Sequence, residues 1–255
     1  MTENSTPKYS RRSVLTVGGA AAASAAFLAA CGGKTPVTRL GSAPTTVKTM
    51  EEPVTDVVLL RTAMSVETMV SNLLNDKVVT SLASGSTASV IGGFASAHKA
   101  NLSGIASLIS ARGGAAYNGT NDKLMVAYGQ PALDLIEAGK DKTDALALAL
   151  ALESLTAATY QYFVSLTNER AVRAAMMRIG ATSARRAAVA AQLINSGTQA
   201  FTPSVDDKGV ATVATLPGSF GGLSAQQVTL GPVNPESGTR AVILMDTPSL
   251  NSLIY

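Results

Sequence analysis

The chain has 255 residues, of which 46% are hydrophobic and 15% charged, and its formal net charge is +3. The single cysteine excludes an internal disulfide and any metal site built from several thiolates. No basic stripe carries interleaved aromatic residues, so the composition argues against nucleic-acid binding.

Residues 1–31 have the pattern of an export signal. Arg11 and Arg12 precede an uncharged run over residues 13–30, and Cys31 follows that run. The stretch SRRSVL resembles a twin-arginine signal, and LAAC resembles the lipobox of bacterial prolipoproteins. The resemblance implies lipidation of Cys31 and anchoring of the exported chain at the outer face of the cytoplasmic membrane. The alternative is a short transmembrane anchor, which a run rich in Ala and Gly fits less well.

Residues 32–56 are rich in Thr and Pro and lack hydrophobic periodicity, which predicts a flexible tether. Without Glu3, Lys8, Arg11 and Arg12, the chain has 17 basic and 16 acidic residues, so the exported part is nearly neutral. The remaining length of about 200 residues is enough for one domain with a substantial core. We expect a helical domain over residues 57–198 and an extension over residues 199–255.

Four stretches show the hydrophobic spacing of helices that pack on one another, at about residues 56–76, 87–112, 143–167 and 169–195. Each expected buried face has a polar residue near its centre. The faces are Leu60, Met64, Glu67, Ser71 and Leu74; Ile91, Ala95, His98, Leu102, Ile105 and Ile109; Leu146, Leu150, Glu153, Ala157, Tyr160 and Val164; and Val172, Met176, Ile179, Ser183, Arg186, Ala190 and Leu193.

The lengths of the connections predict the topology. About thirty residues with Gly, Pro and Asn separate the second helix from the third, whereas only Asn168 and its neighbours separate the third from the fourth. A short connection requires antiparallel neighbours, and a long one is typical of a crossover that runs the length of a bundle. The predicted fold class is all-α, a four-helix bundle with a long crossover between helices two and three and a short irregular or β extension.

With these faces, the chain resembles the ferritin-like superfamily over about residues 56–196, and specifically the exported ferritin-like domains of bacterial lipoproteins. The resemblance implies two metal ions held by a glutamate from one helix of each pair and a Glu-x-x-His motif from the other. Glu67 and Glu153 match the single glutamates, and His98 matches the first histidine. The other three ligand positions hold Ala95, Ser183 and Arg186. The di-metal site is therefore degenerate.

A guanidinium at a ligand position repels metal ions and can neutralise buried carboxylates. We therefore expect a metal-free polar core of Glu67, His98, Glu153 and Arg186, with no cofactor. One alternative is a site for a single ion, iron or another divalent metal, held by Glu67, His98 and Glu153. The other alternative is an error of helical register, in which Arg185 faces inward or the cluster is exposed.

No catalytic residue is assigned. Tyr160 could relay electrons in a di-iron protein, but a core aromatic residue with a bonded hydroxyl is the simpler interpretation. Met176 and Met177 are interpreted as packing residues rather than as copper or haem ligands. The glycine cluster GSFGGLS, at residues 218–224, lacks the lysine of a phosphate-binding loop. A catalytic triad would have to recruit His98 from the bundle interior.

Beyond residue 199, the runs at residues 210–216, 226–231 and 240–246 have strand character, and we expect a small sheet or arms over the bundle. The apolar end TPSLNSLIY could dock on the bundle or on another subunit. The charged fraction is below the roughly 25% of typical soluble domains, which favours association with a second copy or with an envelope protein.

Three functions remain open at this point. The first is a non-catalytic binding or scaffold protein tethered to the envelope. The second is an extracytoplasmic metal-binding protein or oxidoreductase that uses Glu67, His98 and Glu153. The third is a protein that binds a small molecule in the emptied metal site.

Overall fold

The computed structural model describes residues 54–205, 207–217 and 225–246. The signal and lipidation positions, most of the predicted tether, the glycine cluster and the apolar C-terminal end lie outside the described residues. Everything below concerns the described part of the chain.

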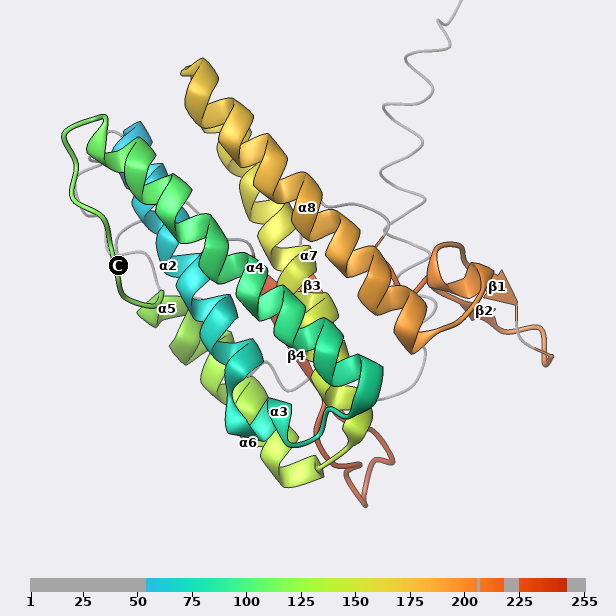
Figure 1. Ribbon diagram of the computed structural model, residues 1–255. Helices are drawn as coiled ribbons and strands as arrows, with labels where there is room; N and C mark the ends of the chain where they lie inside the picture. The colour runs from blue at the N-terminus through green and yellow to red at the C-terminus, as the bar shows by residue number, and fades with distance from the viewer. Residues whose placement is uncertain (1–53, 206, 218–224, 247–255) are drawn as a thin grey trace, which may run out of the picture. The chain divides into compact units, whose positions relative to one another are not determined.

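Four long helices form the bundle that the sequence predicts (Figure 1). They are α2 (Asp56–Asn75), α4 (Gly85–Ser110), α7 (Lys142–Leu166) and α8 (Arg170–Ile194). Side chains cap two of the N-termini, because Thr55 accepts a hydrogen bond from the Val58 N–H and Asp141 accepts one from the Thr143 N–H. These ends lie within two residues of the predicted ones, since apolar periodicity and capping residues are local signals.

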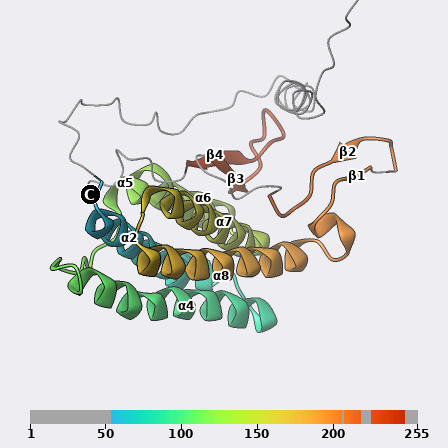
Figure 2. The ribbon, with the colours of Figure 1, turned by 90° about the horizontal axis from the view of Figure 1, so that it is seen from above.

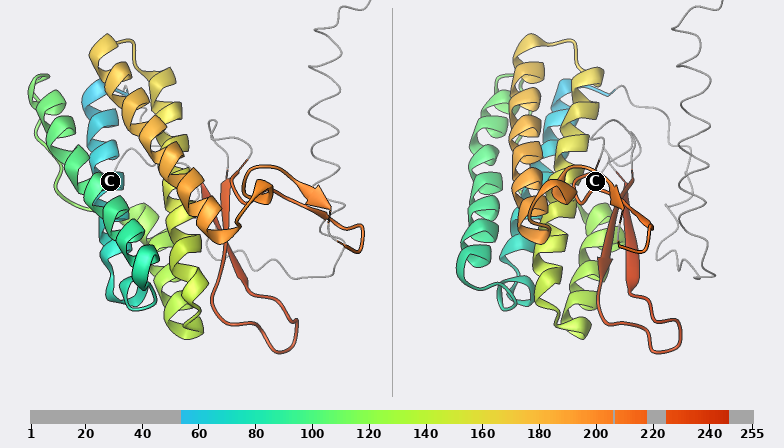
Figure 3. Two further views of the ribbon diagram at one scale, coloured as in Figure 1. Left: turned by 45° about the vertical axis from the view of Figure 1, so that its right-hand side comes forward. Right: turned by 90° about the vertical axis from the view of Figure 1, so that its right-hand side faces the viewer.

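The helices are paired as two hairpins, α2 with α4 and α7 with α8, and each hairpin has an extensive internal interface. Contacts of α2 with α7 and of α4 with α8 close the bundle (Figure 3). Gly180 permits the close approach of α8 to α7, because a Cβ atom at this position would lie 2.9 Å from the Cβ atom of Tyr160. The short helix α3 (Lys77–Thr80) connects α2 to α4.

The crossover between α4 and α7 is more regular than the sequence predicts. It contains α5 (Asp122–Leu124), a π-helical turn η1 (Met125–Gly129) and α6 (Gln130–Gly139). Gly129 and Pro131 obscure this helix in the sequence, because both residues normally mark turns. Pro131 is tolerated because it lies in the first turn of α6, where its missing N–H needs no helical partner.

The buried apolar side chains form two clusters, and each of the four long helices contributes to both. On α4 and α8 the predicted polar residue separates the two clusters, whereas Glu67 on α2 and Glu153 on α7 lie within the first cluster, close to where the second begins. The helix α2 is long and apolar enough to cross a membrane by length and composition alone, but 72% of its most apolar window is buried, as expected for a core helix.

A few predicted core positions are not fully buried. Leu193 is 43% exposed because it lies in the last turn of α8, and Met177 is 59% exposed because it lies about 100° around the helix from the buried Met176. The packing role predicted for Met177 is therefore wrong. Leu102, Leu150 and Val164 are half-buried at the edges of the core.

The C-terminal extension contains two small hairpins. In the first, β1 (Ser204–Val205) pairs with β2 (Ala211–Thr212) after the short helix η2 (Thr198–Ala200). In the second, β3 (Ala225–Leu230) pairs with β4 (Ala241–Asp246) and packs on α7 and α6 (Figure 2). The prediction of a small sheet over the bundle is confirmed for β3 and β4.

A buried aspartate fixes the β3–β4 hairpin to the start of α7. Asp144 accepts a hydrogen bond from the Gly231 N–H at 3.0 Å through Oδ2, and its Oδ1 atom contacts the guanidinium of Arg240. Arg240 also donates from Nε to the Gly231 carbonyl at 2.6 Å. The hairpin is therefore held by an ion pair between the buried Asp144 and the half-buried Arg240 as well as by apolar packing.

Candidate functional site: a charge-balanced polar core

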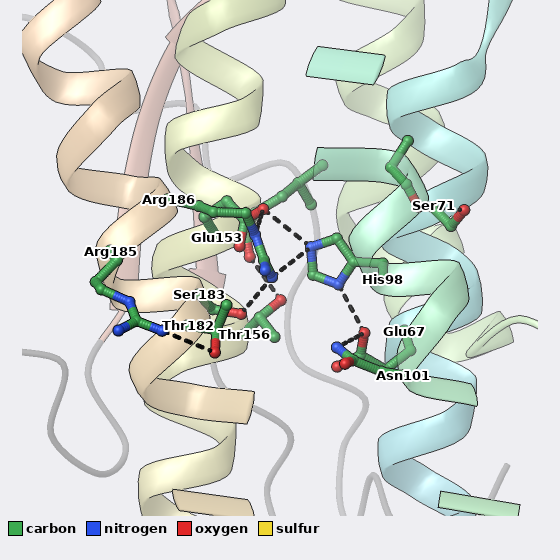
Figure 4. Close-up of polar contacts among 12 residues, drawn as sticks. Glu67, Ser71, His98, Asn101, Glu153, Thr156, Thr182, Ser183, Arg185 and Arg186 are labelled. Carbon is green, nitrogen blue, oxygen red and sulfur yellow. Dashed lines mark hydrogen bonds and ion pairs between the residues drawn. The ribbon is translucent and has the colours of Figure 1, made fainter. Parts of the chain in front are cut away.

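Each long helix brings one ionisable side chain to the centre of the bundle (Figure 4). Glu67 comes from α2, His98 from α4, Glu153 from α7 and Arg186 from α8. The first three are 0% exposed and Arg186 is 9% exposed. The structure therefore brings together the four residues that the sequence singled out, although they span more than 100 positions of the chain.

The four side chains form one continuous chain of hydrogen bonds. The Nδ1 atom of His98 lies 2.7 Å from Oε2 of Glu67, and its Nε2 atom lies 3.0 Å from Oε1 of Glu153. Arg186 donates from Nε to the same Oε1 atom of Glu153 at 2.6 Å. The imidazole thus bridges the two glutamates and uses both of its ring nitrogens.

The carboxylates determine the protonation state of this histidine. Burial by itself lowers the pKa of His98, but the charge of Glu67, hydrogen bonds to both carboxylates and the charge of Glu153 outweigh burial and raise the pKa from 6.5 to about 9. At neutral pH the ring is an imidazolium that donates from both nitrogens. Two carboxylates and two cations then balance, which removes the cost of burying an unpaired charge.

Two neutral side chains complete the coordination of Glu67. Tyr160 donates from its hydroxyl to Oε1 at 2.6 Å, and Asn101 donates from Nδ2 to Oε2 at 3.1 Å. Burial, together with the charge of Glu67, raises the pKa of Tyr160 well above its usual value of 10.0, so the phenol stays protonated and remains a donor. The interpretation of Tyr160 as a core aromatic residue with a bonded hydroxyl is confirmed.

Asn101 is a member of the cluster that the sequence analysis does not predict. It lies three residues after His98 and therefore on the same face of α4. That spacing is the signal by which it could have been found.

Ala95 and Ser183, which stand at the two glutamate positions that the resemblance implies, are buried and carry no carboxylate. Ser183 accepts a hydrogen bond from Nη2 of Arg186 at 2.9 Å, and the backbone carbonyl of Ala95 accepts one from the hydroxyl of Ser71 at 3.1 Å. Arg185 is exposed and points away from the cluster (Figure 4). The alternative in which Arg185 faces inward is therefore wrong.

The comparison with known protein families agrees with this architecture. A family model described as a ferritin-like domain matches residues 4–196. The chain belongs to the ferritin-like domain family. No curated protein and no solved structure matches the chain. The four long helices of this ferritin-like protein lie within the matched residues, and the β3–β4 hairpin lies beyond them.

The polar core of this ferritin-like protein does not fit a di-metal site. Within the described residues, no group of three or more His, Cys, Asp and Glu side chains is arranged to hold a metal ion. The raised pKa of His98 keeps both ring nitrogens protonated at neutral pH, so neither offers a lone pair to a metal ion. The guanidinium of Arg186 lies against Glu153 and 3.4 Å from Nε2 of His98. Protein sites for two such ions need several anionic oxygens and neutral imidazoles.

One acceptor of the cluster has no partner. In the described part of the chain, Oε2 of Glu153 is buried and makes no hydrogen bond, while Oε1 accepts from both His98 and Arg186. A buried carboxylate oxygen without a donor is costly. This atom is therefore the point at which the ferritin-like core could accept a further donor or a cation.

Proposed function

We propose that this ferritin-like protein is a lipoprotein tethered to the cell envelope and acts as a non-catalytic binding or scaffold protein. The observation that carries the proposal is the ion-paired bridge from Glu67 through His98 to Glu153, with Arg186 at a lost ligand position. Two protein cations there supply the positive charge that metal ions supply elsewhere in the family. A metal-independent core leaves the outer surface of the bundle to carry the function.

Metal analysis tests this proposal most directly. We expect iron, manganese and zinc to be well below one ion per chain in protein purified from its own export pathway. Stoichiometric metal that is lost on substitution of His98→Ala would contradict the proposal. The variant Lys99→Ala, which removes an exposed neighbour of His98, is the matched control.

The tether is supported by the sequence features at Arg11, Arg12 and Cys31. We expect Cys31→Ala to abolish incorporation of labelled palmitate and to release the chain from the membrane fraction. We expect the double substitution Arg11→Lys and Arg12→Lys to retain the chain in the cytoplasm. Unchanged palmitate labelling of the Cys31→Ala variant would contradict the lipoprotein proposal.

A second candidate function is extracytoplasmic metal binding or oxidation at a reduced site of Glu67, His98 and Glu153. The unpartnered Oε2 atom of Glu153 favours it. This function requires His98 to lose a proton before it can act as a ligand. Metal binding that appears only as the pH approaches 9, where His98 deprotonates, would distinguish it from the scaffold function.

A further inference from the structure

The helices α4 and α8 lie side by side and form one side of the bundle, whereas α6 and the β3–β4 hairpin lie on the other side (Figure 2, Figure 3). Neither α4 nor α8 contains an Asp or Glu residue. Their exposed charges are all positive. We call these exposed cations the α4–α8 face: Lys99, Arg170, Arg173, Arg178 and Arg185.

The cations of the α4–α8 face have no acidic partners. Among the ion pairs of the described residues, none joins a member of this face to a carboxylate, whereas Arg112 pairs with Glu169 and Arg240 pairs with Asp144. The exposed acids of the crossover lie elsewhere, at Asp122, Asp134 and Glu137, and the exposed Glu169 just before α8 is paired with Arg112. The part of the chain beyond the signal is nearly neutral overall, but its charges are distributed asymmetrically.

Apolar groups accompany these cations. On α8, Met177 and Val189 are 59% and 46% exposed. A pocket of about 160 Å³ opens between the two helices, with Ile105 and Ile179 among its apolar lining residues and Asn101, Ser103 and Arg178 among its polar ones. Arg178 thus borders a small recess with both polar and apolar lining, an arrangement suited to an anionic group attached to a hydrocarbon chain.

We propose that the α4–α8 face docks on the surface of an anionic lipid bilayer. The helix α8 is roughly 37 Å long at 1.5 Å per residue, and its four exposed arginines are spread from its first turn to Arg185, while α4 adds Lys99 beside them. The exposed apolar side chains can enter the interfacial region while the guanidinium groups stay among the phosphates. Docking goes beyond the proposed function and uses the proposed tether only to bring the face close to the membrane.

The orientation of the protein on vesicles tests this proposal. The full-length chain with Cys31→Ser is given one thiol for a fluorescent label, by Ala181→Cys on the exposed side of α8 or by Glu137→Cys on α6. Vesicles contain phosphatidylcholine alone or three parts of it to one part of phosphatidylglycerol, with a headgroup-attached quencher. We expect quenching of the label at position 181 to rise about threefold or more with the anionic lipid, and no change at position 137.

Charge variants show which cations are responsible. The triple variant Lys99→Gln, Arg178→Gln and Arg185→Gln should bind anionic vesicles about tenfold or more weakly than the parent chain. High salt should weaken binding of the parent chain in the same way, because it screens the same charges. The matched control, Lys77→Gln, Lys140→Gln and Lys142→Gln, removes the same charge from other exposed positions and should dock normally.

Three results would overturn the docking proposal. The first is an equal loss of vesicle binding in the two triple variants, and the second is equal quenching at positions 181 and 137. The third is complete displacement of the chain from anionic vesicles by equimolar polyglutamate, because this would indicate an acidic protein partner. Because every chain in this experiment lacks Cys31, a failure of the lipoprotein proposal leaves the result unaffected.

Discussion

Arg186 on α8 donates from Nε to Oε1 of Glu153 on α7 at 2.6 Å, inside the bundle. The resemblance seen in the sequence aligns Arg186 with a metal-ligating histidine, and the structure places the guanidinium of Arg186 inside the bundle. The same oxygen atom also receives the hydrogen bond of His98. Because one carboxylate oxygen accepts from both cations, loss of either cation leaves buried negative charge without its partner. The stability of the bundle therefore depends on these few buried charges.

Removal of the Arg186 charge should destabilise the fold. We expect Arg186→Met to lower the free energy of unfolding by about 3 to 5 kcal/mol, because Glu67 and Glu153 are then left with one cation between them. The free energy is measured by urea denaturation. The control Arg185→Met, at the exposed neighbouring position, should change it by about 0.5 kcal/mol or less.

A double variant separates charge from packing. If charge is the cause, Glu153→Gln combined with Arg186→Met should be more stable than Arg186→Met alone, because the extra buried carboxylate is then absent. Equal stability of the single and double variants would show that lost packing explains the effect.

The free energy of unfolding should decrease in mild alkali. The pKa of His98 is about 9 in the folded chain against 6.5 for the free side chain, so the stabilising protonation is complete below pH 6.5 and is lost as the pH rises to about 9. This shift corresponds to about 3 kcal/mol. Urea denaturation between pH 6 and 9.5 measures it. The variant His98→Gln should lack most of this decrease, and a parallel decrease in that variant would assign it to other groups.

The hydroxyl of Tyr160 should stabilise the core through its bond to Glu67. We expect Tyr160→Phe to cost about 1.5 to 3 kcal/mol, the usual range for a hydrogen bond to a charged group. Thermal or urea denaturation measures the loss. Tyr162→Phe, at a half-buried position on the same helix, is the matched control and should have a clearly smaller effect.

Restoring the family ligands should create a metal site. The triple variant Ala95→Glu, Ser183→Glu and Arg186→His should bind about two iron ions per chain, because Ala95 and Ser183 are buried on the same helix faces as His98 and Arg186. Elemental analysis and the absorbance of ferric protein measure binding. The double variant that retains Arg186 should bind much less iron. Equal binding by the two variants would contradict the role assigned to the guanidinium.

The β3–β4 hairpin should detach when its buried aspartate is neutralised. We expect Asp144→Asn to weaken docking of the hairpin by about 3 kcal/mol, because Arg240 then loses its buried partner. Limited proteolysis should cut near residues 231–240 sooner in the variant than in the parent chain. Glu137→Gln, which neutralises an exposed acid on α6, should be cut at the parental rate.

The sequence by itself determined the four helices, their ends and the inward direction of their central polar residues. These features are local, since a face of a helix repeats every three or four residues and caps lie next to the ends they close. Glu67, His98, Glu153 and Arg186 could therefore be selected without coordinates. The helix α6 was obscured in the sequence because Gly129 and Pro131 interrupt the local pattern that defines the other helices.

Only the tertiary structure decided how these groups pair. These pairings depend on which elements of the fold pack together. They are the bridge of His98 between two glutamates, the hydrogen bond of Tyr160 to Glu67 across 93 positions, and the ion pair of Asp144 with Arg240 across 96 positions. The charge of His98 follows from those distances, because electrostatic interaction in a buried site depends on separation and burial rather than on order along the chain. The sequence determined which residues enter the core, and the packing of the helices determined their partners.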